Sequence, residues 1–297
     1  MPKLSNMVVD SKISMLLKSP YGFGKTIAAC SVAVEGPIFL AYFDKKQPVE
    51  VLSFYKRYRP ELLDNIEYEV YGAANANEYL MKLMKLRDDC RYVAVITDSA
   101  TQLTSAAVNW SMGFRDPKGG KKDKISKDSP QLIPDFDEYK VETSLVTQAL
   151  DISRNLPCHI IWTCHPLPSL KVEGSGTSIK VSTVKNIVTY GNKVGAIIPG
   201  NFTEIYHFVM ENTWDGVTGK YSTRRKVSTV GIGDDFAKTA LNLPAEFDIT
   251  DKLFWEEWKK ARLSEEAKLN DLTINQSSPP QTETFTPAID TFTKWKT

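Results

Sequence analysis

The feature that most constrains this chain is a glycine- and lysine-containing segment near its N-terminus. Residues 19–26 read Ser-Pro-Tyr-Gly-Phe-Gly-Lys-Thr. They match the phosphate-binding pattern G-x-x-x-x-G-K-[ST] at every fixed position except the first, where Ser19 stands in place of glycine. A small residue can often fill that position. The substitution therefore affects the expected loop geometry more than the expected ability to bind a nucleotide.

The residues on either side of this segment occur in the order that a phosphate-binding loop requires. The apolar run 13–17 predicts a buried strand before the loop, and residues 27–34 predict a helix of small residues after it. In that arrangement backbone N–H groups point at an anion, whereas a chance match in a surface turn would lack the ordered strand and helix. The residues expected to contact the nucleotide are Ser19, Pro20, Tyr21, Gly22, Phe23, Gly24, Lys25, Thr26 and Ile27.

Individual positions of the segment have separate expected roles. Gly22 and Gly24 allow positive φ angles and a close approach of the backbone to the phosphates. Lys25 is expected to reach the β- and γ-phosphates of ATP, and Thr26 to offer its hydroxyl to Mg²⁺.

Three polar residues follow predicted strands farther along the chain. Asp98 ends the apolar run 92–97, as the acid of a Walker B strand does, and is expected to hold Mg²⁺ with Thr26. Asp44 ends the strand 37–43 and is a candidate base for the attacking water, or else a turn-forming residue. His165 follows the strand 159–163 and is a candidate sensor of the γ-phosphate, or else an ordinary buried histidine. The predicted catalytic set is thus Lys25, Asp44, Asp98 and His165.

The composition of the chain limits which classes of protein it can belong to. The 297 residues suffice for one large α/β domain, and a net charge of +1 means that a nucleic-acid role would need local basic patches. The four cysteines form no C-x-x-C pair, which suits reduced thiols in a cytoplasmic protein. Cys158-His159 and Cys164-His165 could be considered as metal ligands, but they are expected to bracket one strand instead. No run is long and apolar enough for a membrane span, and the N-terminus lacks the apolar core of a signal peptide.

Strands and helices are expected to alternate along most of the chain. Helices are predicted over 48–58, 76–89, 101–110, 135–155 and 254–267, and further strands over 204–211 and 219–229. The stretch 167–199 is expected to be an extended loop or hairpin. This alternation predicts an α/β fold with a mostly parallel central sheet flanked by helices.

With the 19–26 segment, Asp44, Asp98 and His165 in this order, the chain resembles the RecA-like P-loop ATPases. More narrowly, it looks like the phage-encoded Sak-type RecA-core ATPases of recombination modules, the AAA-domain phage nucleotide-binding proteins. The segments that begin at Gly195, Phe202, Tyr221 and Phe236 have a layout similar to that group. The resemblance spans roughly residues 10–262. The chain departs from it at Ser19, and at Asp44, where the wider group usually has glutamate.

This resemblance implies ATP hydrolysis coupled to single-stranded DNA in phage recombination, repair or replication, in the cytoplasm of a bacterial host. It also implies a homo-oligomer in which a neighbouring subunit completes the ATP site. Arg224, Arg225 and Lys226 could then act in trans on the γ-phosphate, or could simply form a solvated basic strand edge.

Contacts with DNA are expected from two basic segments, which could alternatively be no more than solvated loops. They combine basic side chains with Tyr190, which could stack on a base. The basic residues of the loop 115–134 are Arg115, Lys118, Lys121, Lys122, Lys124 and Lys127, and those of the second segment are Lys171, Lys180, Lys185 and Lys193.

Other functions remain open for a chain with this loop. A small-molecule kinase would need an arginine-bearing lid, and a GTPase normally carries Asn-Lys-x-Asp, for which the nearest match at 192–195 lacks the acid. A loader or assembly factor that uses the nucleotide only as a switch fits the same motifs. We expect one ATPase domain over 1–262 and a flexible low-complexity tail over 263–297. The tail is either a solubilising segment or a docking segment for a partner such as a single-strand-binding protein.

Overall fold

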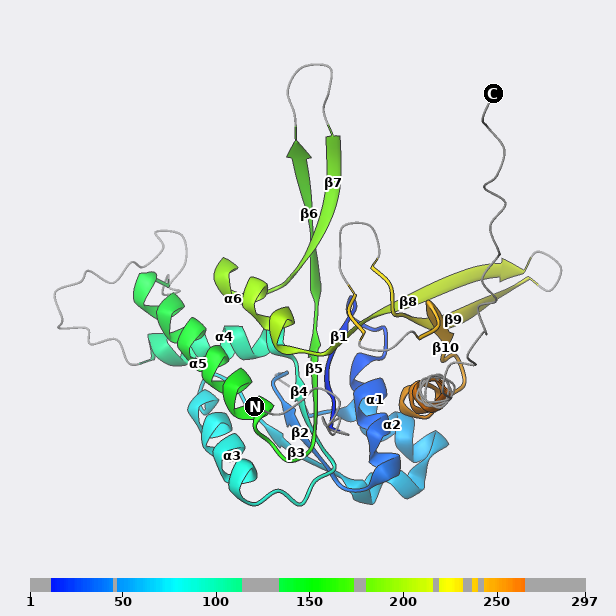
Figure 1. The fold of residues 1–297 in the computed structure, drawn as a ribbon, viewed down its shortest axis with the longest axis horizontal. Helices are drawn as coiled ribbons and strands as arrows, with labels where there is room; N and C mark the ends of the chain where they lie inside the picture. The colour runs from blue at the N-terminus through cyan, green and yellow to red at the C-terminus, as the bar shows by residue number, and fades with distance from the viewer. Residues whose placement is uncertain are drawn as a thin grey trace, which may run out of the picture.

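The structure is a computed structural model that describes residues 12–44, 47–113, 134–173, 180–215, 219–231, 237–239 and 243–264. Within these residues an eight-stranded, mostly parallel sheet forms the centre of the molecule, and helices cover both of its faces (Figure 1). The predicted α/β class with a mostly parallel sheet is therefore confirmed.

The strands of this sheet lie in the order β10-β9-β8-β1-β5-β4-β2-β3. From β8 to β3 all neighbours pair in parallel, whereas β9 pairs antiparallel with both of its neighbours, β8 and β10. The bounds are β1 Ser14–Lys18, β2 Ile38–Tyr42, β3 Ile66–Val70, β4 Ala94–Asp98, β5 His159–Cys164, β8 Glu204–Asp215, β9 Lys220–Ser228 and β10 Glu246–Asp248. A separate hairpin consists of β6 Pro166–Glu173 and β7 Lys180–Ile187.

The helices form two layers because alternate strand residues point to opposite faces. Phe39 packs in one core cluster with residues of α3, α4 and α5, and Leu40 packs in a second cluster with α1, α2 and the helix 254–264. The bounds are α1 Lys25–Cys30, α2 Val49–Tyr58, α3 Ala76–Asp88, α4 Ala100–Met112, α5 Phe136–Arg154 and α6 Asn192–Ile197. Each face of the sheet is thus packed against its own apolar core.

Most predicted elements occur within one or two residues of their expected bounds, with two notable differences. The helix after the 19–26 loop begins earlier, at Lys25, and after Cys30 it continues as a 3-10 helix over Ser31–Glu35. The strand expected over 204–211 is longer and reaches Asp215 as β8. The stretch predicted as a loop or hairpin contains the β6–β7 hairpin and the short helix α6.

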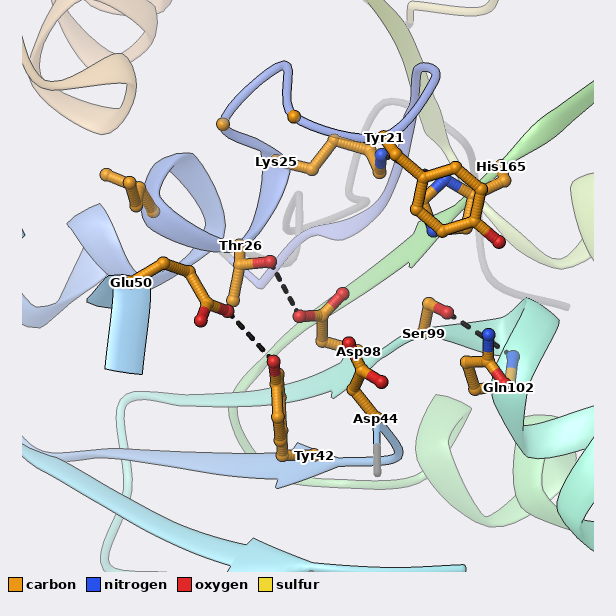
Figure 2. A pocket seen from close by; sticks show the side chains of 13 residues that line it. Tyr21, Lys25, Thr26, Tyr42, Asp44, Glu50, Asp98, Ser99, Gln102 and His165 are labelled. Carbon is orange, nitrogen blue, oxygen red and sulfur yellow. Dashed lines mark hydrogen bonds between the residues drawn. The ribbon is translucent and has the colours of Figure 1, made fainter. Parts of the chain in front are cut away.

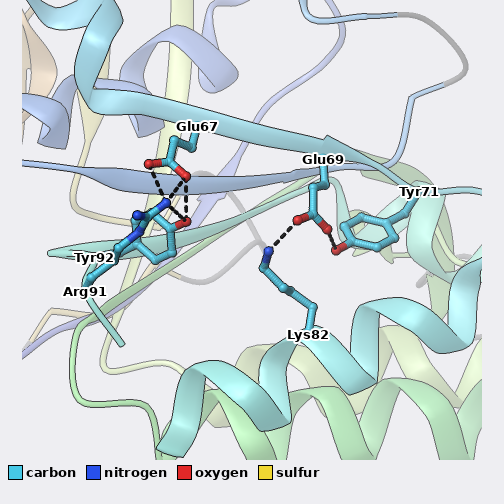
Figure 3. Close-up of polar contacts among 6 residues, drawn as sticks. All are labelled: Glu67, Glu69, Tyr71, Lys82, Arg91 and Tyr92. Carbon is cyan, nitrogen blue, oxygen red and sulfur yellow. Dashed lines mark hydrogen bonds and ion pairs between the residues drawn. The ribbon is translucent and has the colours of Figure 1, made fainter. Parts of the chain in front are cut away.

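Strand β3 was not predicted, although its sequence alternates Ile-Glu-Tyr-Glu-Val. It lies at the edge of the sheet, where charged side chains discourage pairing with another chain. Glu67 accepts hydrogen bonds from Arg91 and from the hydroxyl of Tyr92 at 2.8 Å, and Glu69 pairs with Lys82 and Tyr71 (Figure 3). These contacts connect the edge strand to α3 and to the segment before β4.

Several expectations fall outside the described residues. The basic loop lies there over 114–133, as do residues 174–179 at the tip of the β6–β7 hairpin and almost all of the predicted tail, from 265 to 297. Among the described residues, no helix combines the length and the apolar character that crossing a membrane requires.

Candidate functional site

A cleft of about 280 Å³ opens at the carboxyl-terminal edge of the parallel strands. Ligands of open parallel sheets bind at this edge, because the loops that follow neighbouring strands meet there. The register places Tyr42 of β2 beside Asp98 of β4, and the 19–26 loop follows β1. The side chains and backbone that line the cleft come from Tyr21, Gly22, Gly24, Lys25, Thr26, Ile27, Tyr42, Asp44, Glu50, Asp98, Ser99, Gln102 and His165 (Figure 2).

The 19–26 loop depends on two left-handed glycines. Gly22 has a φ of 80° and Gly24 a φ of 86°, in a region that side chains with a Cβ rarely adopt. A Cβ at either position would have no neighbour within 4 Å. The backbone conformation, and not crowding, therefore makes glycine necessary at these two positions, as their predicted role requires.

Lys25 is the first residue of α1, and its ammonium group lies inside the loop. It donates hydrogen bonds to the carbonyl oxygens of Ser19 at 2.8 Å and Pro20 at 2.9 Å, and to the hydroxyl of Ser19 at 3.0 Å. Burial lowers the pKa of Lys25 to about 8, although the charge of Asp98 opposes that shift. The long side chain of Lys25 allows its ammonium group to turn from these oxygen atoms to an anion bound in the loop.

His165 contacts both the lysine and the loop. Its Nδ1 lies 3.2 Å from Nζ of Lys25 and 3.2 Å from the carbonyl oxygen of Ser19, and its ring stacks on Tyr21 at a centroid distance of 3.7 Å. Burial and the charge of Lys25 lower the pKa of His165 to about 4. The imidazole is therefore neutral near pH 7, and its Nδ1 can accept a hydrogen bond from the ammonium group of Lys25.

Thr26 and Asp98 form the second polar contact of the cleft. The hydroxyl of Thr26 donates to Oδ2 of Asp98 at 2.7 Å, and Thr163 donates to Oδ1 of the same carboxylate. Burial raises the pKa of Asp98, and the two hydroxyl donors together with Lys25 oppose that shift. Two hard oxygen ligands side by side, one of them a carboxylate, suit Mg²⁺. Both residues of the predicted metal pair are thus brought together.

Two carboxylates line the side of the cleft beside β2. Asp44 follows β2 as predicted, and its side chain is exposed. Glu50, which we did not predict, lies in the first turn of α2 and accepts a hydrogen bond from the hydroxyl of Tyr42 at 2.9 Å. Burial and this hydrogen bond raise the pKa of Tyr42, so the phenol stays protonated. The cleft therefore presents two acidic groups in addition to Asp98.

The structure also separates some predicted residues from the cleft. Ser19 is buried behind Lys25, and Phe23 packs against the core cluster of α1 and α2. Arg224 and Arg225 are exposed on β9, and Lys226 pairs with Glu211 at 3.1 Å. None of the three basic residues lines the cleft. The residues of the cleft that sequence reasoning missed are Tyr42, Glu50, Ser99 and Gln102.

The cleft connects directly to the β6–β7 hairpin. Strand β5 ends at Cys164, His165 follows, and β6 begins at Pro166. The carbonyl of His165 accepts a hydrogen bond from the N–H of Val188 at 2.8 Å, just after β7, and its N–H donates to the hydroxyl of Thr101 at 3.1 Å. The same residue thus contacts Lys25 through its ring and holds the base of the hairpin through its backbone.

Comparison with protein-family models gives no match for this chain, and comparison with curated proteins gives none either. Within the residues that the structure describes, no group of three or more His, Cys, Asp or Glu side chains is arranged to hold a metal ion.

Proposed function

We propose that this protein is a P-loop ATPase that binds ATP with Mg²⁺, hydrolyses it to ADP and phosphate, and acts on single-stranded DNA. The observation that carries the proposal is the position of Lys25 inside the glycine loop, next to the contact between Thr26 and Asp98 at 2.7 Å. A lysine, a hydroxyl and a buried carboxylate in this order are the parts that P-loop NTPases use to hold phosphates and Mg²⁺.

In this mechanism some residues of the cleft bind the nucleotide and the metal ion, and Asp44 acts in the hydrolysis step. Lys25 turns from the carbonyl oxygens of Ser19 and Pro20 to the β- and γ-phosphates, where its charge offsets the charge that develops during transfer. Thr26 and Asp98 would hold Mg²⁺, which would offset negative charge on the phosphates during the transfer. Asp44 takes the proton of the attacking water, because its carboxylate lines the cleft at the end of β2.

The coupling to DNA is proposed through His165. A phosphate that draws Lys25 away removes the contact between Nζ of Lys25 and Nδ1 of His165, and His165 is followed directly by the β6–β7 hairpin. The segment 167–199 and the loop 115–134 carry the basic residues expected to contact the DNA backbone. Support for DNA as the partner also comes from the resemblance to phage recombination ATPases, which further suggests recombination, repair or replication as the setting.

The proposal is tested by measuring ATP hydrolysis by the full chain with and without single-stranded DNA. Lys25→Ala is compared with Lys56→Ala, which removes an exposed lysine on α2 outside the cleft. We expect hydrolysis that DNA stimulates in the wild type and in Lys56→Ala, and none in Lys25→Ala. A rate of hydrolysis that does not change when DNA is added would favour a nucleotide switch or a kinase. A rate in Lys25→Ala equal to that of the wild type would refute the assignment of the site.

A further inference from the structure

The outer part of the β8–β9 ribbon carries an exposed aromatic pair. Trp214 and Tyr221 are directly opposite each other, with ring centroids 4.6 Å apart. Cross-strand packing explains the contact between the rings. It leaves 56% of Trp214 and 75% of Tyr221 exposed, however. Figure 1 shows that this part of the ribbon extends beyond the helices that cover the sheet.

The face of the ribbon that bears the two rings is buried and apolar at one end and exposed at the other. It begins at the buried pair Phe208 and Val227, whose side chains belong to the core. The next positions outward on the same face are Met210 opposite Arg225, then Asn212 opposite Thr223, and then the aromatic pair. The hydroxyl of Thr223 donates to Asn212 at 2.8 Å. One exposed face thus presents a cation, an amide and two aromatic rings in sequence.

The charge of the ribbon is positive. Residues 208–228 contain four basic residues against two acidic ones, Glu211 and Asp215, which gives a net charge of +2. Lys226 is paired with Glu211 and Glu246 on the opposite face of the ribbon. Arg225, by contrast, is exposed, and its side chain has no hydrogen bond or ion pair within the described part of the chain. The cation on the aromatic face is therefore available to a ligand.

We propose that this face, consisting of Arg225, Asn212, Thr223, Trp214 and Tyr221, binds single-stranded nucleic acid without sequence preference. Unpaired bases stack on the two rings, because every base has a π-face, and a backbone phosphate meets Arg225. A duplex would not fit in the same way, since its base faces are already stacked. The inference deepens the proposed function, on which it rests, by adding a nucleic-acid contact outside the segments 115–134 and 167–199.

The test is the affinity of the full chain for fluorescein-labelled oligothymidine, measured by fluorescence anisotropy without ATP. Trp214→Ala and Tyr221→Ala remove one ring each, and Trp214→Phe keeps an aromatic ring. Tyr68→Ala is the matched control, because Tyr68 is an exposed tyrosine on β3 at the other edge of the sheet. We expect each alanine variant to bind at least about fivefold more weakly, as loss of one stacked base predicts. Trp214→Phe should retain most of the affinity, and Tyr68→Ala all of it.

The outcomes separate this inference from the proposed function. Wild-type affinity in the double variant Trp214→Ala/Tyr221→Ala would overturn the inference while leaving DNA binding by the protein intact. Failure of the wild type to bind oligothymidine would also overturn it, and ATP hydrolysis measured in the same preparations would show whether the nucleotide site stands. If the double variant changed from oligomer to monomer in light scattering with unchanged DNA affinity, the aromatic face would be a self-association surface and the inference would be wrong.

Discussion

The ammonium nitrogen of Lys25 lies 3.2 Å from Nδ1 of His165, although 140 positions separate the two residues in the chain. Lys25 begins α1, and His165 is the link between β5 and the β6–β7 hairpin. The three N–H donors of Lys25 already face four acceptors within 3.2 Å, namely Nδ1 of His165, the carbonyl oxygens of Ser19 and Pro20, and the hydroxyl of Ser19. An anion in the loop therefore competes with them, and its binding should change the surroundings of His165.

Substitution of His165 tests this contact. His165→Phe keeps a ring that can stack on Tyr21 but removes the Nδ1 acceptor, whereas His165→Asn keeps an acceptor and loses the stacking. We expect His165→Phe to bind ATP but to lose most of the stimulation of hydrolysis by DNA, and His165→Asn to retain part of it. The stimulation is measured as the ratio of the steady-state rates of ATP hydrolysis with and without single-stranded DNA. Wild-type stimulation in both variants would remove His165 from the coupling.

The lowered pKa of Lys25 predicts a pH dependence of nucleotide affinity. Burial places this pKa at about 8 in the free protein, so the lysine is charged below pH 8 and neutral above it. Binding of phosphate to the charged form should therefore weaken by about tenfold per pH unit above the pKa. Calorimetric titration with ATP at several values between about pH 7 and pH 10 measures how the affinity changes with pH. In Lys25→Arg the guanidinium stays charged, so the affinity, even if weaker, should be flat over this range.

Two carboxylates compete for the role of base. Asp44→Asn should lower the turnover number by about 100- to 10,000-fold with ATP affinity retained, since general-base catalysis contributes that much. Glu50→Gln should have a smaller effect, because Glu50 already accepts a hydrogen bond from Tyr42 at 2.9 Å. Single-turnover hydrolysis distinguishes the two variants. The reverse pattern would assign the base to Glu50.

Asp98→Asn tests the metal pair. The amide removes the negative charge beside Thr26 and leaves only one acceptor for the hydroxyls of Thr26 and Thr163. We expect the Mg²⁺ requirement to rise and hydrolysis to fall by about 10- to 100-fold or more, as for residues that support a metal ion. Titration of Mg²⁺ at saturating ATP measures both. Unchanged Mg²⁺ dependence would place the ion elsewhere.

A stability prediction concerns Gly191, at the start of α6. A Cβ built there would overlap Oε2 of Glu142. The side chain of Glu142 is fully buried, and its Oε1 accepts a hydrogen bond from the N–H of Gly191 at 3.0 Å. Gly191→Ala should therefore lower the free energy of unfolding by about 1–3 kcal/mol, the usual cost of overpacking. Gly200→Ala is the control, because nothing lies within 4 Å of its Cβ position. Denaturant unfolding of both variants compares them, and equal stabilities would mean that Glu142 moves freely.

The interior of the fold was predictable, and its edges were not. Strands such as 37–43 and 92–97 are continuous apolar runs, because both faces of a central parallel strand are covered. Strand β3 and the three-residue β10 lack this signal, since edge strands carry polar residues and short strands give little periodicity. The helix after the loop starts at Lys25 and not at Ile27, which the composition of the small-residue run did not indicate.

The cleft was predictable to the extent that its residues follow strands or form a motif. Asp98 is the last residue of β4, and Asp44 and His165 come shortly after β2 and β5. Parallel strands bring such residues to one edge of the sheet. Glu50 was not predicted because acidic residues are common in the first turn of a helix, where they interact favourably with the helix dipole whether or not a site is present. The stacking of Tyr21 on His165 depends on side-chain directions across two loops, which no local pattern records.

Whether the 19–26 loop is a nucleotide site is tested most directly by calorimetric binding of ATP, with and without Mg²⁺, to the wild type, Lys25→Ala and Lys56→Ala. We expect Mg²⁺-dependent binding of one ATP per chain by the wild type and by Lys56→Ala, and a loss of that binding in Lys25→Ala. Absence of ATP binding by the wild type, or equal binding by Lys25→Ala, would contradict the assignment of the 19–26 loop as a nucleotide site.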